Sequence, residues 1–190
     1  MKRLTLKKLL LAALSPFAVN THAQENAIDL ETILESIKSA KSIKIYIAPP
    51  NTAFVTQLNE FRLKQVGYEY DLVDFFDVKS IAETVLQNKP KNNETDLKSF
   101  EPRIGIYFKF ENNAEIKFLF NKIYAGDEFL NGVFEQIRDS KSFPVIVSST
   151  IQKDLFNFLH DYEVRHPKSN ITPQERIWLD FIKDYKNAKW

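Results

Sequence analysis

Residues 104–120 read Ile-Gly-Ile-Tyr-Phe-Lys-Phe-Glu-Asn-Asn-Ala-Glu-Ile-Lys-Phe-Leu-Phe, and this stretch decides the fold. Large apolar side chains recur at every second position on both sides of a polar centre. A period of two puts alternate side chains on one face of a β-strand, so each half predicts a strand with one buried face. The buried sets are Ile104, Ile106, Phe108 and Phe110, then Ile116, Phe118 and Phe120. The stretch therefore predicts a hairpin inside an antiparallel sheet.

The length of the hairpin turn follows from which side chains meet across it. A two-residue turn at 112–113 would pair Phe110 with Glu115 and set charges among core aromatics. A three-residue turn at 112–114 pairs Phe110 with Ile116 instead. Because a slip of one residue moves a whole strand face to the other side, the sequence favours the three-residue turn. Its two asparagines tolerate the left-handed conformation that such turns need.

Strands and amphipathic helices fill the rest of the chain. Period-two patterns and apolar runs predict strands, and apolar side chains at helical spacing predict helices. The expected strands are 43–47, 68–72, 122–125, 129–136 (shorter pieces around Gly126 and an Asn131-Gly132 turn) and 143–147; the expected helices are 28–40, 53–64, 77–86, 151–162 and 172–185. Residues 89–101 are expected to form an exposed loop. The pattern predicts the α+β class, an antiparallel sheet with helices packed on one face.

Three helix starts carry residues that cap a helix. Asp77 is the expected N-cap of the helix at 78–86, because its carboxylate can accept from free amides of the first turn. Residues 148–150 (Ser-Ser-Thr) are expected to cap the helix that begins near Ile151. Thr172-Pro173-Gln174-Glu175 predicts a capping box, in which Thr172 caps and Glu175 reaches back to the amide of Thr172.

The first 23 residues are typical of a secretory signal peptide. Four basic residues precede an apolar run at 9–19, and small residues lead to an expected cleavage between Ala23 and Gln24. The run has about half the roughly 20 apolar residues of a spanning helix and contains Pro16, which disfavours the alternative of an uncleaved anchor. An amphipathic cytosolic start is a third reading. We therefore expect residues 24–190 to form a single domain in the periplasm, without stable membrane insertion.

Composition narrows the classes of function. The chain has 26 basic and 25 acidic residues, and cleavage after Ala23 leaves 22 against 25, a net charge of −3. This balance does not fit a nucleic-acid-binding surface. There is no cysteine, and Met1 is the single methionine, which excludes thiolate catalysis and cysteine–zinc sites. Sixteen phenylalanines and only four glycines indicate a core packed largely with aromatic rings.

Carboxylates are the candidate site residues. Asp71 and Asp74 lie around the end of the second strand, and Asp127 and Glu128 lie in a turn between strands. Paired carboxylates could serve glycan hydrolysis, so an envelope enzyme that cleaves peptidoglycan is an alternative. A solvated acidic edge that contacts a protein partner explains them more simply. No catalytic residue is assigned, and the chain is expected not to be an enzyme.

Histidine and hydroxyl chemistry offer less. His160 and His166 straddle the end of a predicted helix at a spacing that fits no zinc pattern, so no metal and no cofactor are expected. The serines near residue 150 are explained by helix capping. The aromatic content could instead line a lipid or small-ligand pocket, which keeps a carrier as a further alternative. Tyr46, Tyr107 and Tyr124 are expected to point outward, as tyrosines at interfaces do.

Several features follow one another along the chain: the export signal, the strand 43–47 ending in Pro49-Pro50, the segment Arg103-Ile-Gly-Ile-Tyr-Phe, the Asn131-Gly132 pair and a closing helix. This layout resembles a group of small exported bacterial envelope proteins, some of which are immunity partners of toxins delivered into the periplasm. It is a similarity of layout, so it transfers no functional residue. It implies a non-catalytic periplasmic protein that binds a protein partner, such as a toxin whose active site it blocks.

Overall fold

The computed structural model describes residues 29–49, 57–93, 100–121, 128–137 and 141–187. These residues form a seven-stranded antiparallel sheet and five α-helices, which confirms the α+β class. The proposed cleavage site at Ala23 and Gln24, the strand expected at 122–125 and the turn residue Asp127 lie outside the described residues, as do Tyr124 and residues 53–56 of the helix expected at 53–64. In the described part of that segment the helix begins later than expected, at Glu60. None of the helices in the described ranges is both long and apolar enough to cross a membrane.

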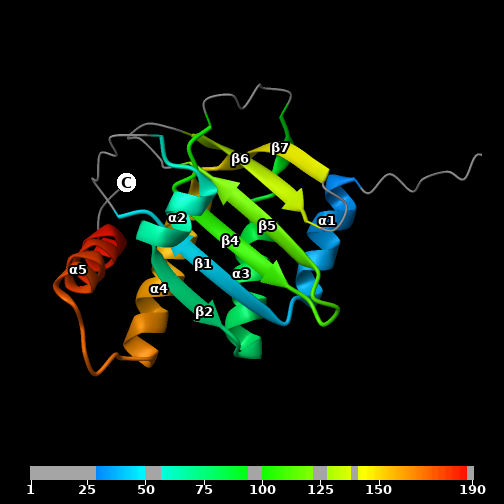
Figure 1. The fold of residues 1–190 in the computed structure, drawn as a ribbon. Helices are drawn as coiled ribbons and strands as arrows, with labels where there is room; N and C mark the ends of the chain where they lie inside the picture. Colours follow the sequence, from blue (N-terminus) through cyan, green and yellow to red (C-terminus); the bar gives the residue numbers. More distant parts are fainter. Residues whose placement is uncertain (1–28, 50–56, 94–99, 122–127, 138–140, 188–190) are drawn as a thin grey trace, which may run out of the picture.

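The sheet is built from a central meander with two additions at its margins. Its strand order is β2-β1-β4-β5-β6-β7-β3, and every neighbouring pair is antiparallel. The strands are β1 (Ser42–Ile47), β2 (Tyr68–Leu72), β3 (Lys91–Asn92), β4 (Ile104–Lys109), β5 (Glu115–Phe120), β6 (Phe129–Gln136) and β7 (Lys141–Ser148). The predicted hairpin supplies β4 and β5, which lie at the middle of the sheet (Figure 1).

Helices cover mainly one face of this sheet. They are α1 (Leu30–Ser36), continued by the 3-10 turn η1 (Ile37–Ser39), α2 (Glu60–Val66), α3 (Phe75–Gln87), α4 (Thr150–Arg165) and α5 (Pro173–Asn187). The apolar sides of α1, α3, α4 and α5 share one core with alternate residues of β1, β2 and β4–β7. Figure 1 shows α2 on the opposite side of the sheet from α3. The prediction of helices on one face is thus right for the main core, and α2 is an addition to it.

The hairpin has the predicted parity but a different turn. Phe108 lies opposite Ile116, and Ile106 lies opposite Phe118. The Phe110 amide donates to the Ala114 carbonyl, so the three turn residues are 111–113 rather than 112–114. The expected pairing of Phe110 with Ile116 is therefore wrong: Phe110 bonds to Ala114, and Ile116 lies opposite Phe108. The apolar side chains of both strands still lie on the same face of the sheet, because even-numbered residues remain opposite even-numbered ones. Asn113 takes the left-handed conformation, with φ of 57°.

Two predictions about strands and turns are wrong. Asn131-Gly132 is no turn, because both residues lie inside β6, where Gly132 is opposite Phe120 and Val145. A Cβ at Gly132 would stand 2.8 Å from the Phe118 ring, so glycine is present there for close packing rather than for a turn. The described start of the expected loop at 89–101 contains β3, a two-residue strand that extends the sheet beyond β7, and residues 94–99 of this loop lie outside the described residues.

Helix starts follow the capping rules with one change of residue. The side chain of Asp74, not Asp77, caps α3 by accepting from the amides of Phe76 and Asp77, at 2.8 and 3.3 Å. The capping box of α5 is confirmed, because Thr172 and Glu175 exchange hydrogen bonds of 2.9 and 3.2 Å. Ser149 occupies the cap position of α4, but its side chain makes no capping hydrogen bond.

The face under α2 holds smaller apolar clusters and a buried tyrosine. Leu58, Leu63 and Ala48 pack together there, beside a group of Tyr107, Leu119 and Val133. Tyr107 is only 2% exposed, so the expectation that it points into solvent is wrong. Because its ring lies beneath α2, it serves packing rather than an interface.

Candidate functional site

A groove of about 660 Å³ lies at one end of the sheet. It lies where β1 begins, β4 turns into β5 and β6 ends, beside η1. We call this cavity the groove. Its lining comprises Ser36, Lys38, Ser39, Ala40, Lys41, Phe75, Phe110, Glu111, Asn112, Ala114, Glu115, Ile116 and Gln136. Its volume falls in the range of small-molecule sites, roughly 300–1,000 Å³, but it opens to the surface and is not enclosed by the helices.

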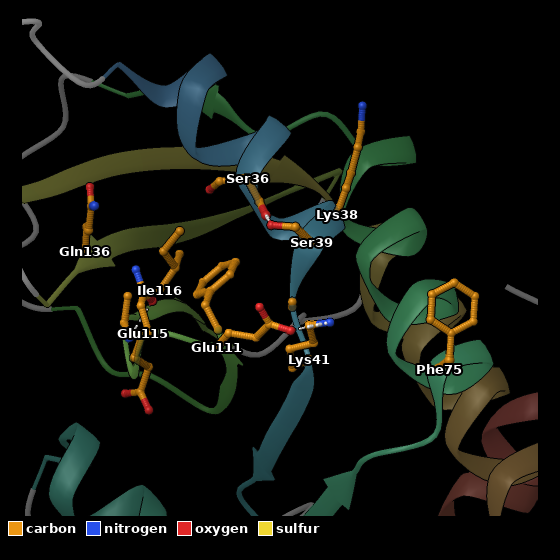
Figure 2. A pocket seen from close by; sticks show the side chains of 13 residues that line it. Ser36, Lys38, Ser39, Lys41, Phe75, Glu111, Glu115, Ile116 and Gln136 are labelled. Atoms are coloured by element: carbon orange, nitrogen blue, oxygen red, sulfur yellow. Dashed lines mark hydrogen bonds and ion pairs between the residues drawn. The ribbon is translucent and has the colours of Figure 1, made fainter.

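The groove combines an apolar lining with charged residues. Phe110 directly follows β4 and Ile116 lies in β5, and Lys41 Nζ lies 2.8 Å from Glu111 Oε1. The hydrogen bond from Lys41 holds the pKa of Glu111 below its ordinary value of 4.5. Figure 2 shows this ion pair within the groove, with Gln136 and Phe75 on opposite sides of it. The groove thus offers an apolar surface with charges of both signs.

One polar atom of the groove has no partner. The side-chain oxygen Oε1 of Gln136 is buried and accepts no hydrogen bond from the described residues. Buried acceptors in folded proteins are almost always satisfied. The Gln136 amide is therefore available to a donor, whether from water or from a bound group.

An exposed apolar cluster adjoins the groove. Val73, Phe75 and Phe76 are 73%, 70% and 76% exposed, and we call these three residues the aromatic tip. The rings of Phe75 and Phe76 meet edge to face with centroids 5.6 Å apart. Since Phe75 also lines the groove, the aromatic tip and the groove form one continuous surface.

The first turn of α3 holds the aromatic tip in a fixed position. Asp74 caps this turn, and Asp77 is 4% exposed with its Oδ1 2.8 Å from Arg165 Nη2. His166 lies near the same carboxylate, with 3.9 Å from Nε2 to Oδ2. The ion pair ties the start of α3 to the end of α4. Phe75 and Phe76 are therefore presented by a turn that is anchored at both its cap and its buried side.

Two of the four predicted acidic site residues lie beside the aromatic tip. Asp71 is exposed in β2, with Oδ2 3.4 Å from Lys44 Nζ, and Asp74 is exposed at the cap of α3. Glu128 is exposed just before β6, which β1, β4 and β5 separate from β2. Asp71 and Asp74 thus lie close along the chain on either side of Val73, whereas Glu128 lies elsewhere in the sheet. Whether any of them binds a partner stays a prediction.

The histidines show no metal-site geometry. His160 Nδ1 lies 3.2 Å from the carboxylate of its neighbour Asp161, and His166 caps the end of α4 near Asp77. Within the described residues, no three His, Asp or Glu side chains are grouped as ligands of a metal ion.

A second charged cluster lies on the opposite face of the sheet. Lys117 Nζ lies 2.6 Å from Glu60 Oε2 and 2.5 Å from Glu135 Oε2, and Glu60 also pairs with Lys64. The hydroxyl of Tyr107 donates to Glu60. These contacts tie α2 to β5 and β6 and fully account for the side chains, so we interpret the cluster as structural.

The sequence contains a signal for the aromatic tip just before the apolar stripe of α3. Asp74-Phe75-Phe76-Asp77 has a residue that can cap a helix at each end, and the predicted cap is Asp77. A cap at Asp74 puts both phenylalanines in the first turn, ahead of the apolar stripe that begins at Val78. The groove could not be found in this way, because it depends on how η1 and the hairpin turn lie in space.

Glu175, at the start of α5, predicts a pH effect on stability. Its hydrogen bonds from Lys168 and from Thr172 lower its pKa from 4.5 to about 2. A depressed folded-state pKa gives stability that is present above pH 4.5 and is lost as the pH falls toward 2. We expect Glu175→Gln to lower the free energy of unfolding by about 0.5–1 kcal/mol at pH 6.

The matched control for this substitution is Asp180→Asn, an exposed change farther along α5. Urea unfolding of both variants at pH 6 and pH 3 provides the measurement. The difference in the free energy of unfolding between wild type and Glu175→Gln should be smaller at pH 3 than at pH 6. A gap that stays constant with pH would show that the carboxylate charge does not support the helix start.

No protein-family model matches the chain, and no significant match occurs among curated proteins or solved structures.

Proposed function

We propose that the chain is an exported, non-catalytic binding protein, specifically an immunity protein that neutralises a toxin acting in the periplasm. The observation that carries this proposal is the aromatic tip beside the groove. Two phenylalanine rings that are 70% and 76% exposed lie next to one another in an anchored helical turn. Clustered exposed apolar side chains of this kind mark binding surfaces more often than single ones do.

The aromatic tip favours binding in two ways, because its turn is already ordered and its rings lose contact with water when a partner covers them. A partner that covers Phe75 and Phe76 removes large apolar surfaces from water, and the capped turn means little conformational entropy is lost on binding. The neighbouring carboxylates Asp71 and Asp74 would form part of a polar rim and favour a basic partner surface. A toxin with a cationic substrate-binding cleft has this complementary charge.

A second candidate function is a small-ligand or lipid carrier. It is favoured by one specific observation, the 660 Å³ groove with the unpartnered Oε1 of Gln136. A carrier is not expected to protect a cell from killing by neighbouring cells of the same strain. The two functions therefore differ in the competition experiment that follows.

The test is contact competition between the parent bacterium and a strain that lacks this gene. We expect the parent to kill the deletion strain and the wild-type gene to restore survival. Phe75→Asp combined with Phe76→Asp should fail to restore it, because losing two interface residues that each contribute about 2 kcal/mol weakens binding roughly 1,000-fold. Equal survival of parent and deletion strain would contradict the immunity proposal.

The matched control is Phe61→Asp. Phe61 is 68% exposed on α2, a helix on the other face of the sheet, so the substitution is equivalent in chemistry and exposure. Phe61→Asp should protect as well as wild type does. All three substituted positions are exposed, so the free energy of unfolding should change by less than about 0.5 kcal/mol per site. Thermal melts of the purified variants check this point.

A further inference from the structure

The sheet ends at β2 with a margin to which no described strand is added. β2 pairs with β1 on one side, and β1 pairs with β4 on its other side. Figure 1 shows β2 at the outer margin of the sheet, on the side of α4 and α5. An edge strand carries a row of backbone donors and acceptors that can pair with another extended chain.

The backbone groups that face outward can be identified from the register. The Ala48 amide donates to Arg103 across the β1–β4 pair, so even-numbered residues of β1 bond toward β4 and odd-numbered ones toward β2. Ile45 lies opposite Tyr70, which therefore directs its N–H and C=O to β1. The neighbouring residues Glu69 and Asp71 must then direct theirs to the open side. Both residues are exposed.

Each end of this edge offers a place for side chains of an incoming strand. A pocket of about 340 Å³ lies at the Tyr68 end, between β2 and the facing ends of α4 and α5. Its aromatic wall is formed by Tyr68 stacked on Trp178, with centroids 5.1 Å apart. The aromatic tip, Val73, Phe75 and Phe76, lies directly beyond the other end of β2.

Charge argues for a basic strand and against a second copy of this chain. Glu69 and Asp71 both pair with Lys44, at 2.6 and 3.4 Å, and the ion pairs among the described residues give them no second cation, so the two carboxylates carry an excess of negative charge along the edge. In an antiparallel β2–β2 dimer centred on Tyr70, Glu69 would lie opposite Asp71 of the other copy, and like charges in that position repel. Lysine or arginine opposite these carboxylates would be attracted instead.

We propose that β2 is a strand-addition site for an extended segment of the protein partner, in which basic and apolar residues alternate. Basic side chains lie opposite Glu69 and Asp71, on the face of the sheet that also carries α2. The apolar residue of the partner segment that lies between the two basic residues faces the helices, as Tyr70 does. The apolar residues of that segment that lie opposite Tyr68 and beyond it reach the 340 Å³ pocket. This inference rests on the proposed function, since it names how that partner binds.

A proline substitution separates backbone pairing from charge. Asp71→Pro removes one outward N–H and leaves the β1 ladder intact, because Asp71 does not bond to β1. Asp71→Ala removes the same carboxylate but keeps the N–H, so it is the matched control. A lost backbone hydrogen bond of about 1.5 kcal/mol should make Asp71→Pro bind roughly tenfold more weakly than Asp71→Ala. Equal affinities would overturn the proposal.

The probe for this comparison is the peptide acetyl-Lys-Val-Lys-Val-Lys-Val-Lys-amide, followed by ¹⁵N chemical shifts of the purified protein. The amides of residues 69–73 should shift on titration. In antiparallel pairing the lysine amides face β2, so N-methylation of the lysines should weaken binding about tenfold and N-methylation of the valines should not. No binding, equal binding of both methylated peptides, or shifts confined to the groove would overturn strand addition.

Further outcomes distinguish the two proposals and the rival occupant. If Asp71→Pro protects cells in competition as well as Asp71→Ala does, while Phe75→Asp with Phe76→Asp does not, strand addition fails and the immunity function stands. If the deletion strain competes equally but the peptide binds as expected, the immunity function fails and the edge site stands. A dimer in sedimentation with residues 69–73 protected from hydrogen exchange would identify a second copy as the occupant and overturn the proposal.

Discussion

Trp178→Ala should lower the free energy of unfolding by about 3–5 kcal/mol, the range for removing a large aromatic side chain from a core. Trp178 is 2% exposed. Its ring stacks on Tyr68 and meets Phe156 edge to face at 5.5 Å, and its Nε1 donates to the hydroxyl of Tyr70. One side chain thus fastens α5 to β2 and to α4. Its removal also leaves the buried hydroxyl of Tyr70 without this donor.

The neighbouring residue supplies the control for this prediction. Ile177 is 62% exposed on the same helix, so Ile177→Ala should change stability by less than about 0.5 kcal/mol. Urea unfolding of both variants measures the difference, and hydrogen exchange of α5 shows whether the helix detaches. If Trp178→Ala were as stable as Ile177→Ala, the packing of α5 on β2 described here would be wrong.

Lys117→Met should destabilise the protein by about 1–3 kcal/mol at pH 7. The substitution keeps an apolar stem of similar length but removes the ammonium group between Glu60 and Glu135. Breaking a buried ion pair costs about 3–5 kcal/mol, and partial solvent access to both carboxylates lowers this value. The Lys117 side chain is 13% exposed, against 28% for Glu60 and 34% for Glu135.

The effect should depend on pH in a defined direction. Partial burial raises the pKa of Glu60, but hydrogen bonds from Lys117 and Lys64 outweigh it and hold the pKa below its ordinary value of 4.5. Stability from a depressed carboxyl pKa is present above pH 4.5 and is lost as the pH falls through the folded-state pKa. The gap between wild type and Lys117→Met should therefore be largest near neutral pH and shrink below about pH 4.

Lys44→Met is the control for this cluster. Lys44 also bridges two carboxylates on the same face of the sheet, but Glu69 and Asp71 are 45% and 53% exposed. Such a surface arrangement contributes roughly 0–1 kcal/mol. Two results would show that the cluster does not hold α2 to the sheet. One is a loss of unfolding free energy for Lys117→Met that is no greater than that for Lys44→Met, and the other is a loss for Lys117→Met that is the same at pH 7 and pH 3.

The fold class could be predicted because it follows from local periodicity. Alternation along 104–120 predicts the central hairpin and its parity, since a slip of one residue would bury charges. The exact turn could not be predicted in the same way. Turns at 111–113 and 112–114 bury the same side chains, so apolar pattern alone does not separate them. The capping box at Thr172 was predictable because all its hydrogen bonds lie within one turn.

The errors arise where the tertiary context decides. Asn131-Gly132 has the composition of a turn, but the crowding of the Phe118 ring requires glycine inside β6. Tyr107 alternates as an outward residue, yet α2 packs over it from another part of the chain. Asp77 resembles a cap, but it is buried against Arg165, 88 residues later. None of these contacts can be predicted from the spacing of apolar residues along the sequence.

The candidate site was predictable only in part. Asp71 and Asp74 were singled out by their clustering in the sequence, and they lie beside the aromatic tip. The tip itself, the groove and the free edge of β2 depend on the strand order and on where α3 begins. The aromatic tip adjoins the groove through Phe75 and follows the end of the edge strand β2, and this surface is the basis of the binding proposal.

Photo-crosslinking at position 76 tests the central claim most directly. Benzoylphenylalanine replaces Phe76 in one strain and Phe61 in a second, and both strains are irradiated while in contact with the parent bacterium. The account predicts a covalent adduct with a protein at position 76 and none at position 61. No adduct at position 76, or the same adducts at both positions, would contradict the claim that the aromatic tip binds a protein partner.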